Sequence, residues 1–374
     1  MVPLREADGT CGAKAVGLRR LLDAGLAVPD GLVIPHAGRD GWEHDLDEAL
    51  RRLGPGPYAV RSSALAEDGV RTSYAGQLAT FLPSAPTDAP ADASPDAPTD
   101  IAAAVRRTAR SGGTPSARAY AAAVGDPVPD VVPVIVQVMV EPDAAGVAFT
   151  RHPVTGADEV VVEAVRGRGD RLVGGTVTPE RWTVRGDATV RQEASTEPVI
   201  TADPAITAQQ SVEVATAARR VEHLFGRPQD VEWAISSGTL WLLQARPITT
   251  APPAGTRPSQ PGEVLATGTP ASPGVAAGPV RVVTGLDDFG TFDAGDVLVC
   301  RTTSPAWTPL LVRAAAVVTE TGGILAHAAI VARELRIPAV VAVDRATTTL
   351  PAGRPVVVDG TAGSVSAGPR VAGA

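Results

Sequence analysis

The segment Thr319–Leu335 combines residues that could carry a phosphoryl group. It places Gly322 and Gly323 after an apolar run and His327 at the start of a helix-forming run. The first turn of a helix presents unpaired N–H groups and the positive end of the helix dipole, so a phosphate on His327 would lie in a favourable field. A core histidine that follows a Gly-Gly turn would show the same pattern, and local physics does not separate the two.

Lys14 is the one lysine among 33 basic residues. Gly12 precedes it, and the expected helix begins near Ala15. A compact ammonium group at a helix start can meet an anion where a planar guanidinium would fit less well. The spacing of the glycines is not that of a P-loop, and a surface lysine kept by chance is an equal alternative.

Arg61 follows a strand-like apolar run, and Ser62 and Ser63 come directly after it. The loop beyond them contains Gly76 and Gln77. An arginine together with hydroxyl and backbone N–H donors is the set of groups that binds a polyphosphate. A capped loop with a solvent-exposed arginine is the simpler explanation of this motif taken alone.

Glu232 and Gln244 are candidate metal ligands on two strands that we expect to pair, Val231–Ile235 and Thr239–Ala245. Residues two apart on a strand share a face, so Gln244 and Arg246 point the same way and Glu232 can join them. Carboxylate and amide oxygens suit Mg²⁺, and a neighbouring arginine can neutralise phosphate. A cross-strand charge pair on a solvated face is the alternative.

The bulk composition bounds the class of protein. The 374 residues suffice for two or three domains, and with 44% hydrophobic but only 3% aromatic residues the cores must rely on Val, Ala and Leu. A net charge of −8 and a pI near 5.2 argue against binding of nucleic acid or anionic membranes by bulk charge. Cys11 and Cys300, the only cysteines, form neither a disulfide framework nor a metal cluster, which fits a reducing cytosol. The N-terminus shows no apolar signal region, and the run Val131–Val140 is too short to span a bilayer, so we expect a cytoplasmic protein.

Two low-complexity segments divide the chain. Pro83–Asp100 repeats Pro, Ala, Asp, Ser and Thr, and we expect a disordered loop inside a domain. Thr250–Gly262 is rich in Pro, Gly and Ser and is typical of a linker between domains. We therefore expect a first domain over residues 1–250, a flexible linker over 251–262 and a second domain over 263–370.

Both regions mix helical and strand patterns, which predicts an α/β (α+β) chain. The expected helices are Gly17–Ala24, Ile101–Ser111, Ser211–Phe225, Pro309–Ala314 and the run that begins near His327. The expected strands, besides the pair named above, are Gly31–Pro35, Leu78–Leu82, Val132–Val140, Gly146–Thr150, Glu159–Val165, Gly278–Val283, Asp296–Arg301, Ala316–Thr319, Ala339–Val343 and Pro355–Asp359.

Taken together, these motifs resemble the phosphoenolpyruvate synthase, pyruvate phosphate dikinase and rifamycin phosphotransferase superfamily. The resemblance covers nearly the whole chain, and its motifs occur in the order of the family. The matching segments are Gly12–Ala15, Val28–Gly31, Val60–Ala64, Glu67–Asp68, Ala75–Gln77, Val136–Gln137, Gly146–Thr150, Pro153–Gly156, Gly174–Pro179, Asp230–Trp233, Gln244–Ile248, Gly322–Gly323, His327–Leu335 and Ile337–Val340.

The resemblance implies an ATP-grasp nucleotide-binding domain followed by a compact α/β swivelling phosphohistidine domain, with ATP and Mg²⁺ as cofactors. It implies that ATP is cleaved to AMP and phosphate and that the β-phosphate passes through phospho-His327 to an acceptor at another site. His327 would be the catalytic nucleophile, and Glu232 and Gln244 would hold Mg²⁺. The implied nucleotide-binding residues are Lys14, Arg61 and Arg246 at the ATP phosphates, with Ser62, Gly76, Gln77, Thr80, Gln137, Val138 and Val140 around the nucleotide.

The chain departs from the pattern of the family in three ways. Leu325 and Ala326 stand before His327 where relatives usually carry Thr or Ser, so regulation by a phosphothreonine is not expected and transfer would be slowed or redirected. Val138 stands where a lysine is frequent, which changes the adenine side of the site. No acceptor domain is visible, so we expect the acceptor at the interface of the two domains or on a separate subunit.

Three functional hypotheses follow. The first is a phosphotransferase of the dikinase type that acts on a hydroxyl or enol acceptor, such as a secondary metabolite or an antibiotic. The second is a phosphocarrier that delivers phosphate to a separate acceptor-binding protein, since the His327 motif also resembles that of phosphotransferase-system enzyme I. The third is a non-catalytic ATP-binding homologue, suggested by Leu325 and Ala326. All three expect a small-molecule or protein partner and neither nucleic acid nor membrane.

Overall fold

A computed structural model describes residues 1–65, 78, 80–82, 100–125, 129–185, 189–193, 204–248 and 262–368. The chain forms two compact units. The first comprises Met1–Glu141 and Trp233–Arg246, and the second comprises Pro142–Glu232 and Pro247–Ala374. The expected disordered loop and the expected linker lie outside the described residues, apart from Asp100 and Gly262 at their ends.

The first unit is built on a five-stranded antiparallel sheet in the order β1-β2-β5-β3-β4. Its central strand, β5, is buried from its first residue to Gln137, as its continuous apolar run requires. The five strands are β1 (Val2–Pro3), β2 (Gly31–Ile34), β3 (Tyr58–Ser62), β4 (Thr80–Phe81) and β5 (Val134–Val138).

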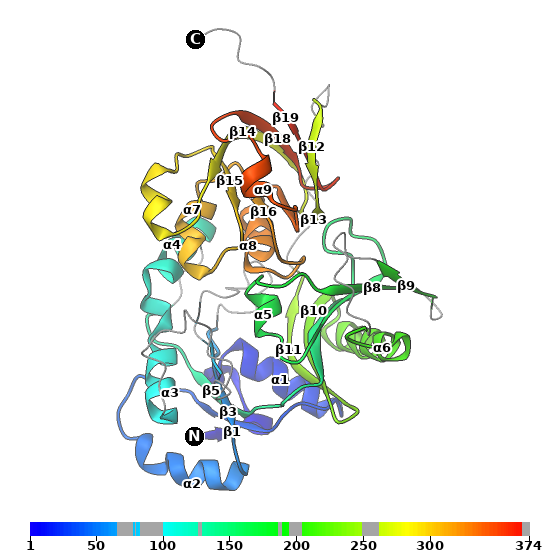
Figure 1. Cartoon of the computed structure of the whole chain (residues 1–374). Helices are drawn as coiled ribbons and strands as arrows, with labels where there is room; N and C mark the ends of the chain where they lie inside the picture. Colours follow the sequence, from blue (N-terminus) through cyan, green and yellow to red (C-terminus); the bar gives the residue numbers. More distant parts are fainter. Residues whose placement is uncertain are drawn as a thin grey trace. The chain divides into compact units, whose positions relative to one another are not determined.

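Four helices accompany this sheet (Figure 1). α3 packs on β3 and β5 through Ala104 and Val105, and Asp100 caps its first turn by accepting the Ala102 N–H at 2.9 Å. α4 begins with a proline at its first position, where the missing N–H costs nothing. The helices are α1 (Ala13–Asp23), α2 (Glu43–Leu53), α3 (Ile101–Ala109) and α4 (Pro115–Val124).

A six-stranded sheet has the order β11-β10-β6-β7-β8-β9, and the division between the two units falls within its β10–β11 hairpin. In the second unit, α6 packs on β6, β7 and β8. A capping box between Thr207 and Gln210 starts α6, and Gly226 ends it in the left-handed conformation. The elements are β6 (Ala144–Phe149), β7 (Val160–Arg166), α5 (Asp170–Val173), β8 (Glu180–Arg185), β9 (Thr189–Glu193), α6 (Ala208–Phe225), β10 (Gln229–Ser236) and β11 (Thr239–Pro247).

The rest of the second unit is an eight-stranded sheet in the order β12-β19-β18-β14-β15-β16-β17-β13. Its middle strands, β14 to β17, run parallel, and antiparallel strands flank them on both sides. The strands are β12 (Val264–Thr267), β13 (Thr269–Ser272), β14 (Val275–Val282), β15 (Val297–Cys300), β16 (Ala316–Thr319), β17 (Ala339–Val341), β18 (Pro355–Asp359) and β19 (Ser364–Ala367).

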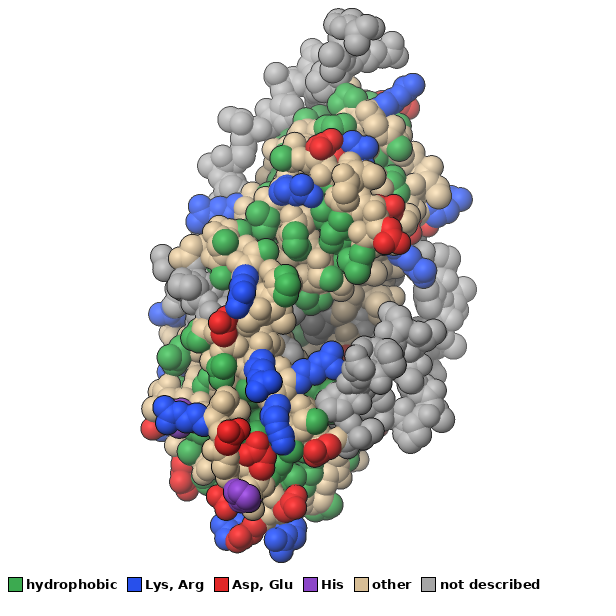
Figure 2. Space-filling model, turned by 90° about the vertical axis from the view of Figure 1, so that its left-hand side faces the viewer, with side chains coloured by type: hydrophobic (Ala, Val, Ile, Leu, Met, Phe, Trp, Pro, Cys, Tyr) green, Lys and Arg blue, Asp and Glu red, His purple; other side chains and the backbone are tan. Residues whose placement is uncertain are grey.

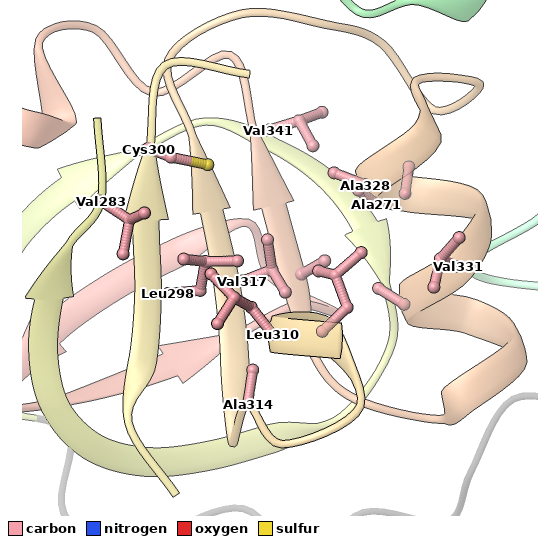
Figure 3. Packing of buried hydrophobic residues seen from close by; sticks show 14 of the residues in the cluster. Ala271, Val283, Leu298, Cys300, Leu310, Ala314, Val317, Ala328, Val331 and Val341 are labelled. Carbon is pink, nitrogen blue, oxygen red and sulfur yellow. The ribbon is translucent and has the colours of Figure 1, made fainter. Parts of the chain in front are cut away.

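Three helices, α7 (Thr308–Leu311), α8 (His327–Leu335) and α9 (Ala346–Thr349), belong to this sheet. α8 connects the parallel strands β16 and β17, so the three elements form a βαβ unit. Figure 3 shows Ala328 and Val331 of α8 facing the sheet, where they join one buried cluster with Leu298 and Val317. This packing fixes the start of α8 at the carboxyl edge of the parallel strands.

On the face displayed in Figure 2, acidic, basic and hydrophobic side chains are interspersed, and no large patch of one charge is visible. That mixture agrees with the modest net charge of −8. Within the described ranges, none of the helices combines the length and apolar character needed to cross a bilayer.

The predicted α/β class is confirmed, and nearly all of the expected strands and helices occur within a few residues of their predicted limits. One boundary was wrong: α1 begins at Ala13, not near Ala15, so Lys14 lies in its first turn. The reason is that Gly12, at φ +85°, acts as the N-cap. α2 was not among the expected helices, although its Leu46, Leu50 and Leu53 have helical spacing.

Replacing Leu298 by alanine should destabilise the second unit by about 2–5 kcal/mol, because this fully buried side chain would leave a cavity in the cluster of Figure 3. Denaturant unfolding of the whole chain measures the loss. The matched control is Leu286→Ala, a leucine that is 60% exposed, for which we expect a change within about 0.5 kcal/mol. Equal losses in the two variants would contradict the assigned core.

Candidate active site

His327 is the first residue of α8, and the loop 320–326 joins it to the end of β16. Thr303 lies just beyond the end of β15, which pairs in parallel with β16. Because parallel neighbours end at the same edge, both residues lie at the carboxyl edge of the sheet. Open α/β sheets bind their ligands at this edge.

A hydrogen bond fixes the imidazole ring. Thr303 Oγ1 lies 2.9 Å from His327 Nδ1, and both side chains are buried. In the tautomer protonated on Nδ1, the ring donates this bond to the hydroxyl oxygen, and the Nε2 lone pair becomes the nucleophilic position. The contact is compatible with the tautomer that attacks through Nε2.

Burial also sets the protonation state of His327. Desolvation disfavours the imidazolium cation and lowers the pKa of His327 from 6.5 to about 4. The ring is therefore neutral at pH 7, and the neutral form is the one that can act as a nucleophile.

The first turn of α8 has no side-chain cap. The N-cap residue is Ala326, which supplies no side-chain hydrogen bond to the first turn. Ser, Thr, Asp or Asn at this position would have capped the helix. Leu325 and Ala326, which stand where the resemblance leads us to expect Thr or Ser, are both buried, so apolar packing occupies their positions.

Gly322 allows the loop before His327 to fold back on itself. Its φ is +108°, and a Cβ placed on it would lie 2.7 Å from the Ala326 Cβ. An L-residue at this position would be strained by the backbone and blocked by Ala326. The predicted Gly-Gly turn thus has a steric reason.

In the first unit, the segment that carries Lys14 is tied to the end of β3. The Ala13 N–H donates to the Ala64 carbonyl at 3.2 Å, and the Ala15 N–H donates to Ser63 Oγ at 3.0 Å. A Cβ on Gly12 would collide with the Ser63 carbonyl oxygen, so only glycine fits there. Lys14 itself is buried, which is unusual for a lysine and supports the view that it is more than a surface residue.

Arg61 organises a polar cluster in the same unit. Its Nη1 donates to the Leu243 carbonyl at 2.6 Å and to Gln137 Oε1 at 3.4 Å, and its Nη2 donates to Gln244 Oε1 at 2.6 Å. Gln137 Nε2 donates in turn to the Pro29 carbonyl at 2.9 Å. Three of the predicted site residues are therefore in contact, and a buried guanidinium lies at their centre.

The structure also places most of the other predicted nucleotide-binding residues. Arg246 is buried two residues after Gln244 on β11, as the predicted strand parity requires. Ser62 is buried at the end of β3, and Thr80 is the exposed partner of Arg61 across β3 and β4. Two further residues, Val138 and Val140, are half-buried, and Gly76 and Gln77 lie outside the described residues.

Glu232, the predicted carboxylate ligand, is half-buried on β10 and belongs to the second unit, whereas Gln244 belongs to the first. Their oxygen donors fit Mg²⁺, which prefers hard oxygen ligands and completes its shell with water and substrate phosphates. No group of three or more His, Cys, Asp or Glu side chains suited to a metal occurs in the described part of the chain. Gln244 Oε1 accepts the bond from Arg61 Nη2 at 2.6 Å.

Sequence reasoning missed two residues of the His327 surroundings, Thr303 and Glu163. Thr303 had a detectable signal, since a hydroxyl run, Thr302 to Ser304, directly follows a buried strand. Glu163 had none, because a glutamate in the apolar run of β7 shows no spacing that relates it to His327. Its carboxylate nevertheless accepts the Ile324 N–H of the loop at 3.1 Å.

A mixed α/β chain with a buried Lys14 and a buried arginine–glutamine cluster in one unit, and a neutral histidine at a helix start in the other, has the parts of a phosphoryl-transfer protein. The chain belongs to the family described as pyruvate phosphate dikinase, AMP/ATP-binding domain, which matches residues 40–261. A second family, described as PEP-utilising enzyme, mobile domain, matches residues 292–363 and includes His327.

Named relatives agree with this assignment. A probable phosphoenolpyruvate synthase of Methanothermobacter thermautotrophicus is 35% identical over 63% of this chain and 37% of its own length. Another, of Pyrococcus horikoshii, is 34% identical over 91% of this chain and 44% of its own length. Among solved structures, the ATP-grasp ligase PsnB matches 64% of this chain and 52% of its own, with 14% identity and a TM-score of 0.28. The chain thus spans less than half the length of these two synthases.

The expected superfamily is therefore confirmed, and the chain is an ATP-binding member of it. The expected domain limits at 1–250 and 263–370 stay predictions, as do the individual roles of the site residues.

The neutral state of His327 can be checked by NMR titration of the histidine rings in the whole chain. We expect no protonation of His327 between about pH 8 and 5, and a midpoint near the pKa of about 4. Because the folded-state pKa lies below the unfolded value of 6.5, the folded state should lose stability as the pH falls from about 6.5 towards 4.

Thr303→Val should release the ring from its hydrogen bond and populate both neutral tautomers, whereas Thr303→Ser should retain the Nδ1-protonated form. A ring that titrates near 6.5 in the wild-type chain would contradict the buried, neutral histidine.

Proposed function

We infer that this protein is an ATP-dependent phosphotransferase of the dikinase type. The observation that carries the proposal is the neutral, buried His327, bonded to Thr303 at the start of α8, in a chain with an AMP/ATP-binding domain. The names of the relatives, phosphoenolpyruvate synthases, support phosphoryl transfer as the type of reaction.

The first half-reaction forms a phosphohistidine. His327 Nε2 attacks the β-phosphorus of ATP, the bond between that phosphorus and the oxygen bridging to the α-phosphorus breaks, and AMP leaves with the bridging oxygen. Water then removes the γ-phosphate as inorganic phosphate, so ATP and water give phospho-His327, AMP and phosphate. During the attack the Nδ1 proton stays on the ring, held by Thr303 Oγ1.

The cationic side chains of the first unit serve the nucleotide. Lys14, Arg61 and Arg246 are buried, and positive charge at the triphosphate neutralises the charge that builds up on its oxygens. Glu232 and Gln244 would hold Mg²⁺, which would supply further charge neutralisation at the phosphates. Arg61 now donates to Gln244, so ATP and the metal would redistribute an existing hydrogen-bond network.

The second half-reaction passes the phosphoryl group from Nε2 to a hydroxyl or enol oxygen of an acceptor. The names of the synthases support an enol class, and the resemblance to rifamycin phosphotransferases supports a hydroxylated secondary metabolite or antibiotic. The Pro/Gly/Ser linker at 251–262 would let the second domain move between the two sites. Two buried free cysteines, Cys11 and Cys300, support a cytoplasmic location.

Incubation with ATP labelled in its β-phosphate tests the proposal. The wild-type chain should retain acid-labile label and release AMP, whereas His327→Ala should retain none, because the nucleophile is gone. The matched control is His223→Ala, an exposed histidine on α6, which should label like the wild type. A His327→Ala protein that still keeps acid-labile label would overturn the assignment.

A further inference from the structure

A buried carboxylate of the second unit contacts the loop that precedes His327. Glu163 lies on β7 directly opposite Arg181 of β8, and its side chain is fully buried. Its Oε1 accepts a hydrogen bond from Arg181 Nη2 at 2.8 Å and another from the Ile324 N–H at 3.1 Å. One oxygen thus joins the β7–β8 pair to the loop 320–326.

The loop packs so closely against this carboxylate that only glycine fits at position 323. A Cβ on Gly323 would lie 2.6 Å from both Glu163 carboxylate oxygens and 2.7 Å from Pro179 Cγ, so any side chain there would displace the loop. The second carboxylate oxygen, Oε2, is buried and has no hydrogen-bond partner among the residues that the structure describes. The glycine therefore permits close contact, and the carboxylate uses it to bind the loop.

A neighbouring contact holds the same loop. Thr321 Oγ1 donates to the Gly175 carbonyl at 2.7 Å, and Thr302 Oγ1 donates to the same carbonyl at 3.1 Å. A Cβ on Gly175, which has φ +66°, would lie 3.0 Å from the Ala326 Cβ. The loop is thus bound on both sides of Gly322, and His327 follows directly.

We propose that Glu163 is a positioning residue for the phosphorylation of His327. Paired with Arg181, it holds the loop 320–326 against β7 through the Ile324 N–H during the first half-reaction, and thereby keeps the imidazole buried and aimed for attack. Movement of residues 263–370 to the acceptor would break this bond. Glu163 takes no part in bond making or breaking. Only one part of this inference rests on the proposed function: the expected slowing of His327 phosphorylation when Glu163 is replaced.

The size of the effect follows from the strength of these bonds. A hydrogen bond to a charged acceptor is about twice as strong as one between neutral groups. The ion pair with Arg181 fixes the position of the Glu163 carboxylate that accepts the Ile324 N–H. A misplacement of about 1 Å at a reacting atom can cost about 100-fold in rate. Weakening the bond to Ile324 should therefore slow phosphorylation and leave nucleotide binding unchanged, because Glu163 belongs to no predicted nucleotide contact.

The primary variant is Glu163→Gln, which keeps the shape of the side chain and removes its charge. In the full chain we expect ATP-dependent labelling of His327 to slow roughly 10-fold, with ATP affinity within about 2-fold of the wild type. The matched control is Glu159→Gln. Glu159 is also a buried glutamate, paired through Oε2 with Arg185 of β8 at 2.5 Å, and within the described ranges its side chain makes no hydrogen bond or ion pair with the loop. We expect Glu159→Gln to label at the wild-type rate.

A second measurement, the chemical reactivity of His327, should increase where the phosphorylation rate decreases, and it does not need ATP. Diethyl pyrocarbonate modifies accessible neutral imidazoles, and site-resolved mass spectrometry separates His327 from the four other histidines. His327 is only 4% exposed, so it should react slowly in the wild type and several-fold faster in Glu163→Gln. Gly323→Ala, which pushes the loop from the carboxylate, should reproduce both changes even if Glu163→Gln folds poorly.

Wild-type reactivity of His327 in Glu163→Gln and Gly323→Ala would overturn the proposal, and so would equal changes in Glu163→Gln and Glu159→Gln, which would indicate general destabilisation. A wild-type chain that never labels with ATP would instead defeat the proposed function. The reactivity measurement would still decide the positioning role of Glu163 in that case.

Discussion

The hydrogen bond between Thr303 Oγ1 and His327 Nδ1 is the constraint on which the chemistry of the site depends. Burial disfavours the imidazolium, and in the tautomer that attacks through Nε2 the Thr303 hydroxyl accepts the remaining proton of Nδ1. Without the burial the ring would be partly charged near neutral pH, and without the threonine its tautomer would be unspecified. The two residues can meet because they follow neighbouring parallel strands, Thr303 in the loop after β15 and His327 at the start of α8 after β16.

The packing around this contact explains several sequence features that otherwise look unrelated. α8 is buried from His327 to Arg333, and its small residues Ala328 and Ala329 let it lie close to the sheet (Figure 3). Position 322 requires glycine because its φ is positive, and position 323 requires glycine because the Glu163 carboxylate lies so close. Arg333 donates to the Ala271 carbonyl at 2.8 Å and lies over the Phe149 ring, so the far end of the helix is held as well.

Much of this could be predicted from the sequence because its signals are local. Strand and helix periodicity gave most elements, and the Gly-Gly turn with a following histidine placed His327 at a helix start. The contact of Arg61 with Gln244 could not be read from spacing, since 183 residues separate them and the strands that carry them are joined only by the fold. Glu163 was invisible for a related reason: a buried carboxylate in an apolar strand reads as an anomaly until its partner, Ile324, is known.

The central claim is that the phosphoryl group resides on Nε2 of His327 while Nδ1 keeps its proton. Heteronuclear NMR of the ATP-treated chain, with ¹⁵N in its histidines, measures this directly, since the phosphorylated nitrogen couples to ³¹P and the protonated one to ¹H. We expect a single phosphorylated ring with ³¹P coupling at Nε2 and a proton at Nδ1. Phosphorylation at Nδ1, or a ring that remains unmodified while ATP is converted to AMP, would contradict the account.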